Sequence, residues 1–389
     1  MVPVALTFAV LQEGHSAADV GYVLSAEAVP LVCLVLIGGV IADRLSRRAV
    51  MIGSDLVRCA SELLLAALLL TGSPPLWAFL VLAGVLGAGQ AFFNPALTGL
   101  LPLIASPGRL QQANALSGTA ASAAQVAGPA IAGVIVAAGG AGWAIAIDGM
   151  TYAVSAACLA LVRIPARAEH SDESFAAQLR EGWAEFRSRS WLWVTVAQFS
   201  LFNVFTYAPF MVLGAVIADR ALGGAAAWGV ILAAQGAGSV IGGLTVLRTR
   251  TRRPLVAAIL GMACFALPAA LLAARAPAAA IAAAAAVSGA GLAVSDTLWS
   301  TALQQHVPAA VLSRVSAYDW LGSIAFVPLG YALAGPLASA IGIAATLWLG
   351  AGWAVAGGAA ALAFGSVRSL RASPGKGHPG DPVPARQAA

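Results

Sequence analysis

Charged residues are scarce in this sequence. Aspartate, glutamate, lysine and arginine make up only 10% of the 389 residues, whereas 60% are hydrophobic and the mean hydropathy is +0.87. A soluble domain usually carries about 25% charged residues. The composition therefore excludes an ordinary soluble protein. It predicts an all-α membrane protein that crosses the cytoplasmic membrane many times and is surrounded by the lipid bilayer.

Lysine is nearly absent. Lys376, near the C-terminus, is the sole lysine in the sequence, and a Walker A phosphate loop requires a lysine beside its glycines. The metal-binding pattern H-E-x-x-H and the nucleophile pattern G-x-S-x-G are missing too. We therefore expect no enzyme, no catalytic residue and no cofactor. The energy for any transport must then come from an ion gradient or from a partner.

Cysteine is also rare, and the four cysteines lie inside apolar stretches with no C-x-x-C spacing. We expect core thiols and no metal site. The formal net charge of +5 suggests nucleic acid at first sight. However, the basic residues form short clusters between apolar stretches, which fits orientation in a membrane better than binding to a polyanion. We expect no nucleic-acid partner.

Long apolar stretches recur along the chain, each near the ~20 residues that a membrane-spanning helix needs. Eleven full spans are predicted, with approximate limits of 19–42, 49–71, 76–104, 110–138, 143–164, 191–217, 225–247, 255–274, 278–303, 315–338 and 341–364. A shorter apolar segment, Val2–Leu11, precedes them without a charged leader or a cleavage site. We expect twelve helices with the first one truncated. Our hypothesis is a start codon assigned too far downstream, which an upstream extension encoding about ten apolar residues would support.

Arginine residues fall on alternate connections between the predicted spans. One side carries Arg44, Arg47, Arg48, Arg109, the 163–189 segment, Arg248, Arg250, Arg252, Arg253, Arg314 and the tail from Arg368. The other side carries only Arg220 and Arg275. Because cytoplasmic loops are enriched in basic residues, we expect the even-to-odd connections and the C-terminus to lie in the cytoplasm.

Four regions are predicted along the chain. Helices 1 to 6 occupy residues 1–164, a cytoplasmic linker follows at 165–190, and helices 7 to 12 occupy 191–364. In the linker, Phe175, Leu179, Trp183 and Phe186 recur at helical spacing, which predicts an amphipathic helix on the cytoplasmic surface. Residues 365–389 are rich in proline, glycine and alanine, and we expect a disordered tail.

The two halves of the sequence resemble each other. GYVLSAEA from Gly21 matches GVILAAQG from Gly229, and GAGQAFFNP from Gly87 matches GAGLAVSDT from Gly289. These repeats are about 200 residues apart and their spans have the same orientation. They predict two six-helix bundles related by an axis along the membrane normal.

A short charged turn, GGVIADRLSRR, separates the second and third predicted helices. It resembles the signature G-x-L-a-D-r-x-G-r-r of the major facilitator superfamily (MFS), with Ser46 in place of the second glycine. The resemblance implies the MFS fold. An acid paired with an arginine across this turn can act as a latch in one conformational state, although such arginines can also serve only to fix orientation. The predicted latch residues are Gly39, Asp43, Arg44, Arg47, Arg48, Asp55 and Arg58.

Ionisable residues inside spans are informative because each is costly in hydrocarbon unless it is paired or hydrated. Asp55, Arg58 and Glu62 share one face of a helix, so Arg58 can pair with either acid, and a structural charge cluster is the favoured interpretation of Asp55 and Arg58. Glu27, Asp148 and Glu62 are candidates for proton coupling, because an isolated carboxyl in a low-dielectric cavity binds its proton more tightly. A hydrogen bond to a neighbouring helix is the alternative.

Other features of the spans have weaker interpretations. Asp296 and Asp319 lie nearer the cytoplasmic ends of their helices, where gating or loop pairing is the favoured interpretation. Gly128, Pro129 and Gly133 predict a kink and close packing in the fifth helix.

Further blocks narrow the resemblance. QAFFNPALTGLLP from Gln90, LQQANAL from Leu110, VAGPAIAG from Val126 and AIDGMTYAVSA from Ala146 are similar to the drug and siderophore exporters of the MFS, which include macrolide-efflux proteins and the enterobactin exporter. This resemblance implies proton-driven efflux of amphipathic organic compounds, with a small-molecule substrate and the proton as partners. Helix 4 contains Gln90 and no arginine, so the helix-4 arginine motif of other MFS antiporters is absent and the coupling route stays open.

A substrate cavity is expected between the halves near the middle of the membrane. Aromatic and amide side chains suit large, partly polar molecules, although packing is the alternative role for most of the candidates. Besides Glu27, the candidates are Gln90, Phe92, Phe93, Asn94, Gln125, Phe202, Asn203, Tyr207, Gln235 and Trp299.

The sequence leaves several functions open. The main hypothesis is secondary active export by a monomer, through alternating access of the two bundles. Facilitated diffusion or uptake by the same fold is the second hypothesis, and a transport-inactive membrane scaffold or receptor is the third. A membrane enzyme is a distant fourth.

Overall fold

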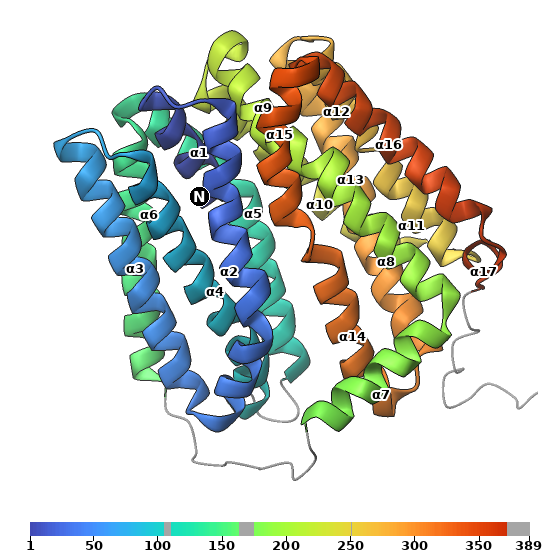
Figure 1. Ribbon diagram of the computed structural model, residues 1–389. Coiled ribbons are helices and arrows are strands. Elements are labelled where there is room, and N and C mark those ends of the chain that lie inside the picture. The colour runs from blue at the N-terminus through green and yellow to red at the C-terminus, as the bar shows by residue number, and fades with distance from the viewer. Residues whose placement is uncertain (105–109, 163–174, 250, 372–389) are drawn as a thin grey trace, which may run out of the picture.

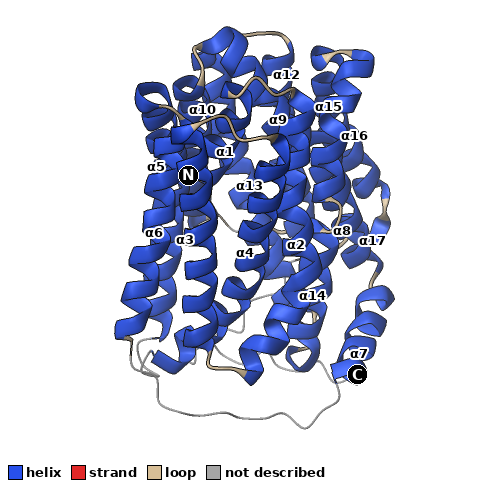
Figure 2. Ribbon diagram, turned by 60° about the vertical axis from the view of Figure 1, so that its left-hand side comes forward, coloured by secondary structure: helices blue, strands red, loops and turns tan. Residues whose placement is uncertain are grey.

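The computed structural model describes residues 1–104, 110–162, 175–249 and 251–371, and in these ranges every regular element is a helix (Figure 1, Figure 2). By length and composition, ten spans in this part of the chain can cross a membrane. Seven of them are simple helices: α2 (Ala17–Arg44), α4 (Leu76–Ile104), α5 (Leu110–Gly139), α6 (Ala141–Leu161), α10 (Ala225–Arg248), α13 (Ala278–His306) and α16 (Ile343–Ala363).

Two further helices complete the predicted twelve. Helix α3 (Arg47–Thr71) has 25 residues, enough to span the hydrocarbon. It differs from the ten by carrying Asp55, Arg58 and Glu62 in its interior, beyond the two arginines at its start. Helix α1 (Val2–Gln12) has 11 residues, and its side chains from Val4 to Val10 are all buried. The prediction of an all-helical fold is confirmed. Helix α3 is absent from the ten apolar spans because its charged residues lower its hydropathy.

Three spans are interrupted where the sequence predicted continuous helices. The first consists of α8 (Ser190–Phe202), the π-helical turn η2 (Asn203–Tyr207), α9 (Ala208–Ile217) and a second π-helical turn, η3 (Ala218–Leu222). The second is divided into α11 (Pro254–Ala263) and α12 (Ala266–Ala273). The third is divided into α14 (Ala309–Ile324) and α15 (Val327–Ile341), a break that is plain in Figure 1. Pro328, which disfavours helix at the residue before it, lies at this last break.

The helices pack mainly within each half of the chain. In the first half α2 packs on α4, and α3 lies against α4 and α6; in the second half α13 packs on α10 and α11, and α12 packs on α16. The halves meet where α5 packs on α10 and where α2 packs on α15 (Figure 1). The predicted division into bundles at 1–164 and 191–364 remains a proposal, which this contact pattern supports.

The linker and the tail are partly described. Helix α7 (Phe175–Ser188) lies in the predicted linker and buries Phe186, whose ring lies 6.1 Å from that of Tyr318 on α14. The tail prediction is corrected at its start, because a short helix, α17 (Gly365–Arg368), buries Val367 completely. A buried side chain there fixes residues that composition alone assigned to a disordered tail; residues 372–389 lie outside the described part.

Candidate functional site

A cavity of about 920 Å³ lies between the two halves of the chain. Its walls come from α1, α2, α4 and α5 of the first half and from η2, α9, α10, α13 and α15 of the second. The volume is at the upper end of the range, about 300 to 1,000 Å³, that small-molecule sites occupy. The arrangement therefore provides room for a drug-sized compound between the halves.

Several polar side chains line this cavity. Five of the predicted residues are among them: Glu27, Gln90, Gln125, Tyr207 and Gln235. Asp296 and Tyr331 also line the wall, although the sequence interpretation did not place them there. The described lining residues include no arginine, lysine or histidine side chain. Acidic, amide and phenol groups are thus set into a largely apolar wall.

The internal repeat explains how two of these residues reach the cavity. Glu27 and Gln235 occupy equivalent positions in the repeated blocks on α2 and α10. The backbone carbonyl of Glu27 packs on Gly87 of α4, and that of Gln235 packs on Gly289 of α13. A methyl group added to either glycine would collide with that carbonyl. Close helix crossings at equivalent glycines therefore hold the two side chains at matching places in the two halves.

Three predicted lining residues lie elsewhere. Phe202 is fully buried in the core, with its ring centroid 5.4 Å from that of Phe265. Asn203 donates its amide to the carbonyl of Ser323 at 2.9 Å, and the indole of Trp299 donates to Asp319 Oδ2 at 3.0 Å. These side chains join helices within the second half. The π-helical turn η2 begins at Asn203 and shifts the register of this span, a feature that helical spacing alone does not reveal.

The three candidates from the block on α4 are also absent from the cavity wall. Phe92 is half-buried and Asn94 is exposed. Phe93 packs against Arg58, whose guanidinium carbon lies 4.4 Å from the ring centroid. Helix α4 thus presents Gln90 to the cavity and Phe93 to a charge cluster within the first half.

That charge cluster is centred on α3. Arg58 forms an ion pair with Asp55, and both side chains are buried. The guanidinium lies between the rings of Phe93 on α4 and Tyr152 on α6, 4.4 Å from each centroid. Arg58 therefore pairs with the nearer of the two acids on its face. Cation–π contacts on both sides stabilise its charge in a site away from water.

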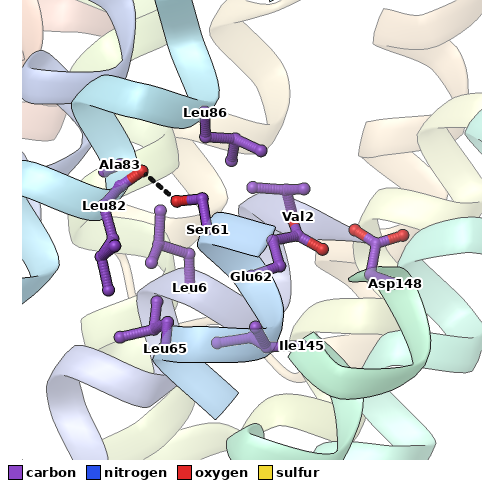
Figure 3. A pocket seen from close by; sticks show the side chains of 10 residues that line it. All are labelled: Val2, Leu6, Ser61, Glu62, Leu65, Leu82, Ala83, Leu86, Ile145 and Asp148. Atoms are coloured by element: carbon purple, nitrogen blue, oxygen red, sulfur yellow. Dashed lines mark hydrogen bonds between the residues drawn. The ribbon is translucent and has the colours of Figure 1, made fainter. Parts of the chain in front are cut away.

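Glu62 and Asp148 form a second acidic site, between α3 and α6. Their side chains are buried, and Glu62 Oε2 and Asp148 Oδ2 have no hydrogen-bond partner in the described part of the chain. Both residues line a void of about 10 Å³ together with Val2 and Leu6, and Figure 3 shows the two carboxyl groups directed toward the same space. This volume is near the smallest that holds one water molecule. The amino group of Met1 lies 4.0 Å from Asp148 Oδ2.

The charged turn between α2 and α3 is partly described. Arg48 Nε donates to the carbonyl of Leu159 at 2.8 Å, and its guanidinium also reaches the carbonyl of Ala160, which ties α3 to the end of α6. The hydroxyl of Ser46 accepts from the backbone of Ala49 and so caps α3. Arg47 makes a contact as well. The surroundings of Gly39 and the side chains of Asp43 and Arg44 lie outside the described part of the chain, so the latch remains a prediction.

The helix-5 glycines lie at a contact between the halves. Helix α5 continues through Pro129 as a single helix. A Cβ added to Gly133 would lie 2.6 Å from the carbonyl oxygen of Ala225, and one added to Gly229 would lie 2.6 Å from that of Pro129. Gly128 has more room, since nothing lies within 3.4 Å of an added Cβ. Two small residues thus allow α5 and α10 to cross closely.

The second contact between the halves lies at the same end of the molecule. The hydroxyl of Ser25 on α2 donates to the carbonyl of Pro328 on α15 at 2.8 Å. Nearer the start of α2, Ala18 packs on Gly335 and Gly21 packs on Tyr331. Figure 1 shows α2 and α15 side by side at the end that also holds the start of α10. Both contacts between the halves therefore close the cavity on one side.

Comparisons with known proteins agree with this architecture. A sequence model described as Major Facilitator Superfamily matches residues 1–323. Macrolide efflux protein A of Streptococcus pyogenes is 28% identical over 174 residues, which are 44% of this chain and 43% of that protein. The putative bacilysin exporter BacE of Bacillus subtilis is 27% identical over 207 residues, 52% of this chain and 51% of that protein. The chain thus spans about half the length of these curated relatives.

Solved structures with the same fold extend the likeness to nearly the whole chain. A mutant of the nucleoside transporter NupG has a TM-score of 0.73 at 17% identity and covers 93% of this chain and 94% of its own. A bacterial homologue of the human lysosomal transporter Spinster, in an inward-facing and occupied conformation, has a TM-score of 0.65 at 15% identity and covers 96% and 94%. At these identities the likeness concerns the fold alone.

Proposed function

We propose, given that this chain belongs to the Major Facilitator Superfamily, that it exports amphipathic organic compounds from the cytoplasm in exchange for protons. The family and the transporter relatives indicate a membrane transporter and not an enzyme. The substrate class we propose is drug-like, macrolide-like or siderophore-like. Relatives named for macrolide and bacilysin efflux support export as the direction.

The observation that carries this proposal is the cavity between the halves. It combines a large apolar wall with Glu27, Gln90, Gln125 and Gln235, a combination that suits compounds with both apolar and polar parts. Alternating access requires such a site at the interface of two bundles that can rock against each other. The cavity lies at that interface, where α5 meets α10 and α2 meets α15.

The contacts between the halves indicate the state of the transporter. They involve the start of α2, the start of α10 and the end of α15, which the arginine distribution places on the outer side of the membrane. Closure at the outer side supports access from the cytoplasm. We therefore infer an inward-facing state. We also propose a cytoplasmic C-terminus, which the arginine distribution supports, and a monomer as the transporting unit.

The proton step is assigned to three carboxyl groups in the first half. Glu62 and Asp148 line the same void of about 10 Å³. Glu62 Oε2 and Asp148 Oδ2 are buried without a hydrogen-bond partner in the described part of the chain, so a proton on either carboxylate removes much of the cost of burying its charge. Glu27 lines the cavity, whereas Glu62 and Asp148 lie behind it. Water that reaches Glu27 from alternate sides would load and unload the proton.

Proton movement in inverted membrane vesicles tests this assignment. With an acid interior recorded by acridine orange, addition of a macrolide should dissipate the pH gradient through wild-type protein. Glu27→Gln and Asp148→Asn should abolish this response at equal expression. The matched control Asp219→Asn, which changes an exposed carboxylate, should retain it. Unchanged dissipation in both acid variants would reject the proton sites, and macrolide movement that ignores the gradient would favour facilitated diffusion.

A further inference from the structure

We propose that the cavity selects amphipathic organic cations and that Asp296 recognises their positive charge. This inference names the substrate class of the efflux proposed above and rests on that function. Asp296 has no part in the proposed proton step, which uses carboxyl groups of the first half alone. Asp296, in the second half of the chain, is therefore available to bind substrate.

The placement of Asp296 is the first observation. It lies on α13, and it lines the cavity together with Leu292, Ala293 and Thr297 from the same helix. Its side chain is exposed to the cavity, and it makes no hydrogen bond or ion pair with the described residues. A carboxylate inside a membrane span is costly unless it is paired or hydrated. An unpaired acid on a cavity wall is thus available to a charged ligand.

Asp319, a nearby acid, differs from Asp296 because it has a hydrogen-bond partner. It lies on α14 and accepts a hydrogen bond from the indole of Trp299 at 3.0 Å. It is not among the residues that line the cavity. Trp299 follows Asp296 by three residues on α13, so this hydrogen bond holds Asp319 near the turn of the helix that carries Asp296. The two acids together make this side of the cavity negative, and only Asp296 is placed to contact a ligand.

The charged side chain on the opposite wall has the same sign. Glu27 lines the cavity from α2, and no arginine, lysine or histidine side chain occurs among the described lining residues. Arg58 is paired with Asp55 inside the first half. Met1 lines the cavity, but its amino group lies 4.0 Å from Asp148 Oδ2, which offsets its charge. The acidic side chains therefore attract a positive ligand from both halves and repel a negative one.

The rest of the wall fits the body of such a compound. Tyr207, Trp228 and Tyr331 supply aromatic rings, and Met211 and Leu232 supply aliphatic surface. Aromatic faces attract organic cations and also bury apolar groups. An amine carried on a large apolar skeleton combines both properties. The wall therefore favours basic amphiphiles over anionic chelators of the siderophore type.

Two probes of the same shape and opposite charge test the selectivity. Tetraphenylphosphonium and tetraphenylborate are each titrated calorimetrically into the purified full chain in detergent, with empty micelles as the blank. The cation should bind at least tenfold more tightly than the anion, a difference of about 1.4 kcal/mol. Asp296→Asn should weaken cation binding at least tenfold, Asp296→Glu should stay within a few-fold of wild type, and Asp219→Asn should have no effect.

Each outcome decides the proposal. Equal or tighter binding of the anion by wild-type protein overturns it without any variant, and so does the absence of binding by either probe. Cation binding that is unchanged in Asp296→Asn overturns the assignment of the residue. Because the titration uses no gradient, it is independent of the proton assay. A transporter that binds cations through Asp296 but ignores the pH gradient would contradict the antiport mechanism alone.

Discussion

Replacing Gly229 with alanine should weaken the contact between α5 and α10 that closes the cavity on its proposed outer side. The added Cβ would lie 2.6 Å from the carbonyl oxygen of Pro129 and 3.1 Å from the Cα of Gly133. The first distance is about 0.8 Å short of the 3.4 Å at which ordinary contact begins. Both neighbours are backbone atoms, so relief requires the two helices to separate and not merely a side chain to rotate.

Two opposing effects set the expected change in the stability of the closed outer contact. Overpacking of this kind costs about 1 to 3 kcal/mol, while alanine stabilises a helix by about 1 kcal/mol relative to glycine. Gly352→Ala on α16 is the matched control, because nothing lies within 4 Å of the added Cβ and only the helix effect remains. The two variants should therefore differ by about 1 to 3 kcal/mol in the stability of the closed outer contact, a population change of about 5- to 150-fold.

Hydrogen–deuterium exchange measures this change directly. In Gly229→Ala, amides of α5 and α10 near the crossing should exchange faster than in wild type, while those of α16 should not. The Gly352→Ala control should leave the crossing as protected as in wild type. Equal protection of the crossing in both variants would refute the view that close backbone packing there holds the outer side shut.

Three further predictions concern side chains of the helix bundle. Asp55→Asn should lower the thermal stability of the purified chain by about 3 to 5 kcal/mol because it leaves the buried charge of Arg58 uncompensated; a loss below about 1 kcal/mol would show that the ion pair is dispensable. Ser46→Ala should cost about 1 kcal/mol through loss of the cap on α3, and a neutral effect on thermal unfolding would contradict that role. Trp299→Phe should cost about 1 to 3 kcal/mol, since Asp319 loses its donor; an unchanged unfolding midpoint would argue against the hydrogen bond.

Much of the fold follows from the sequence because membrane helices have a simple length and hydropathy signal. The charged face of α3 illustrates the limit of that signal, since Asp55 and Arg58 lower its hydropathy yet are buried as a pair. Ser46 illustrates a second limit. A departure from the glycine of the family signature turns out to supply a helix cap.

The cavity was harder to predict than the fold. Residue type and depth in the membrane do not show which side of a helix faces the cavity, so Phe202 and Asn203 were expected on the wall but pack within the second half. Asp296 was missed because its depth along the helix suggested gating, whereas its side chain lines the cavity. The internal repeat held a usable signal, because its second block aligns Asp296 with Asn94, a predicted cavity residue, and Leu292 with Gln90.

Accumulation of a radiolabelled macrolide in inverted vesicles tests the central claim most directly. With an acid interior, wild-type protein should concentrate the compound above its external level, and collapse of the pH gradient by nigericin should return it to equilibrium. Vesicles without the protein set the background. Uptake that reaches only the external concentration, with or without the gradient, would contradict proton-driven export.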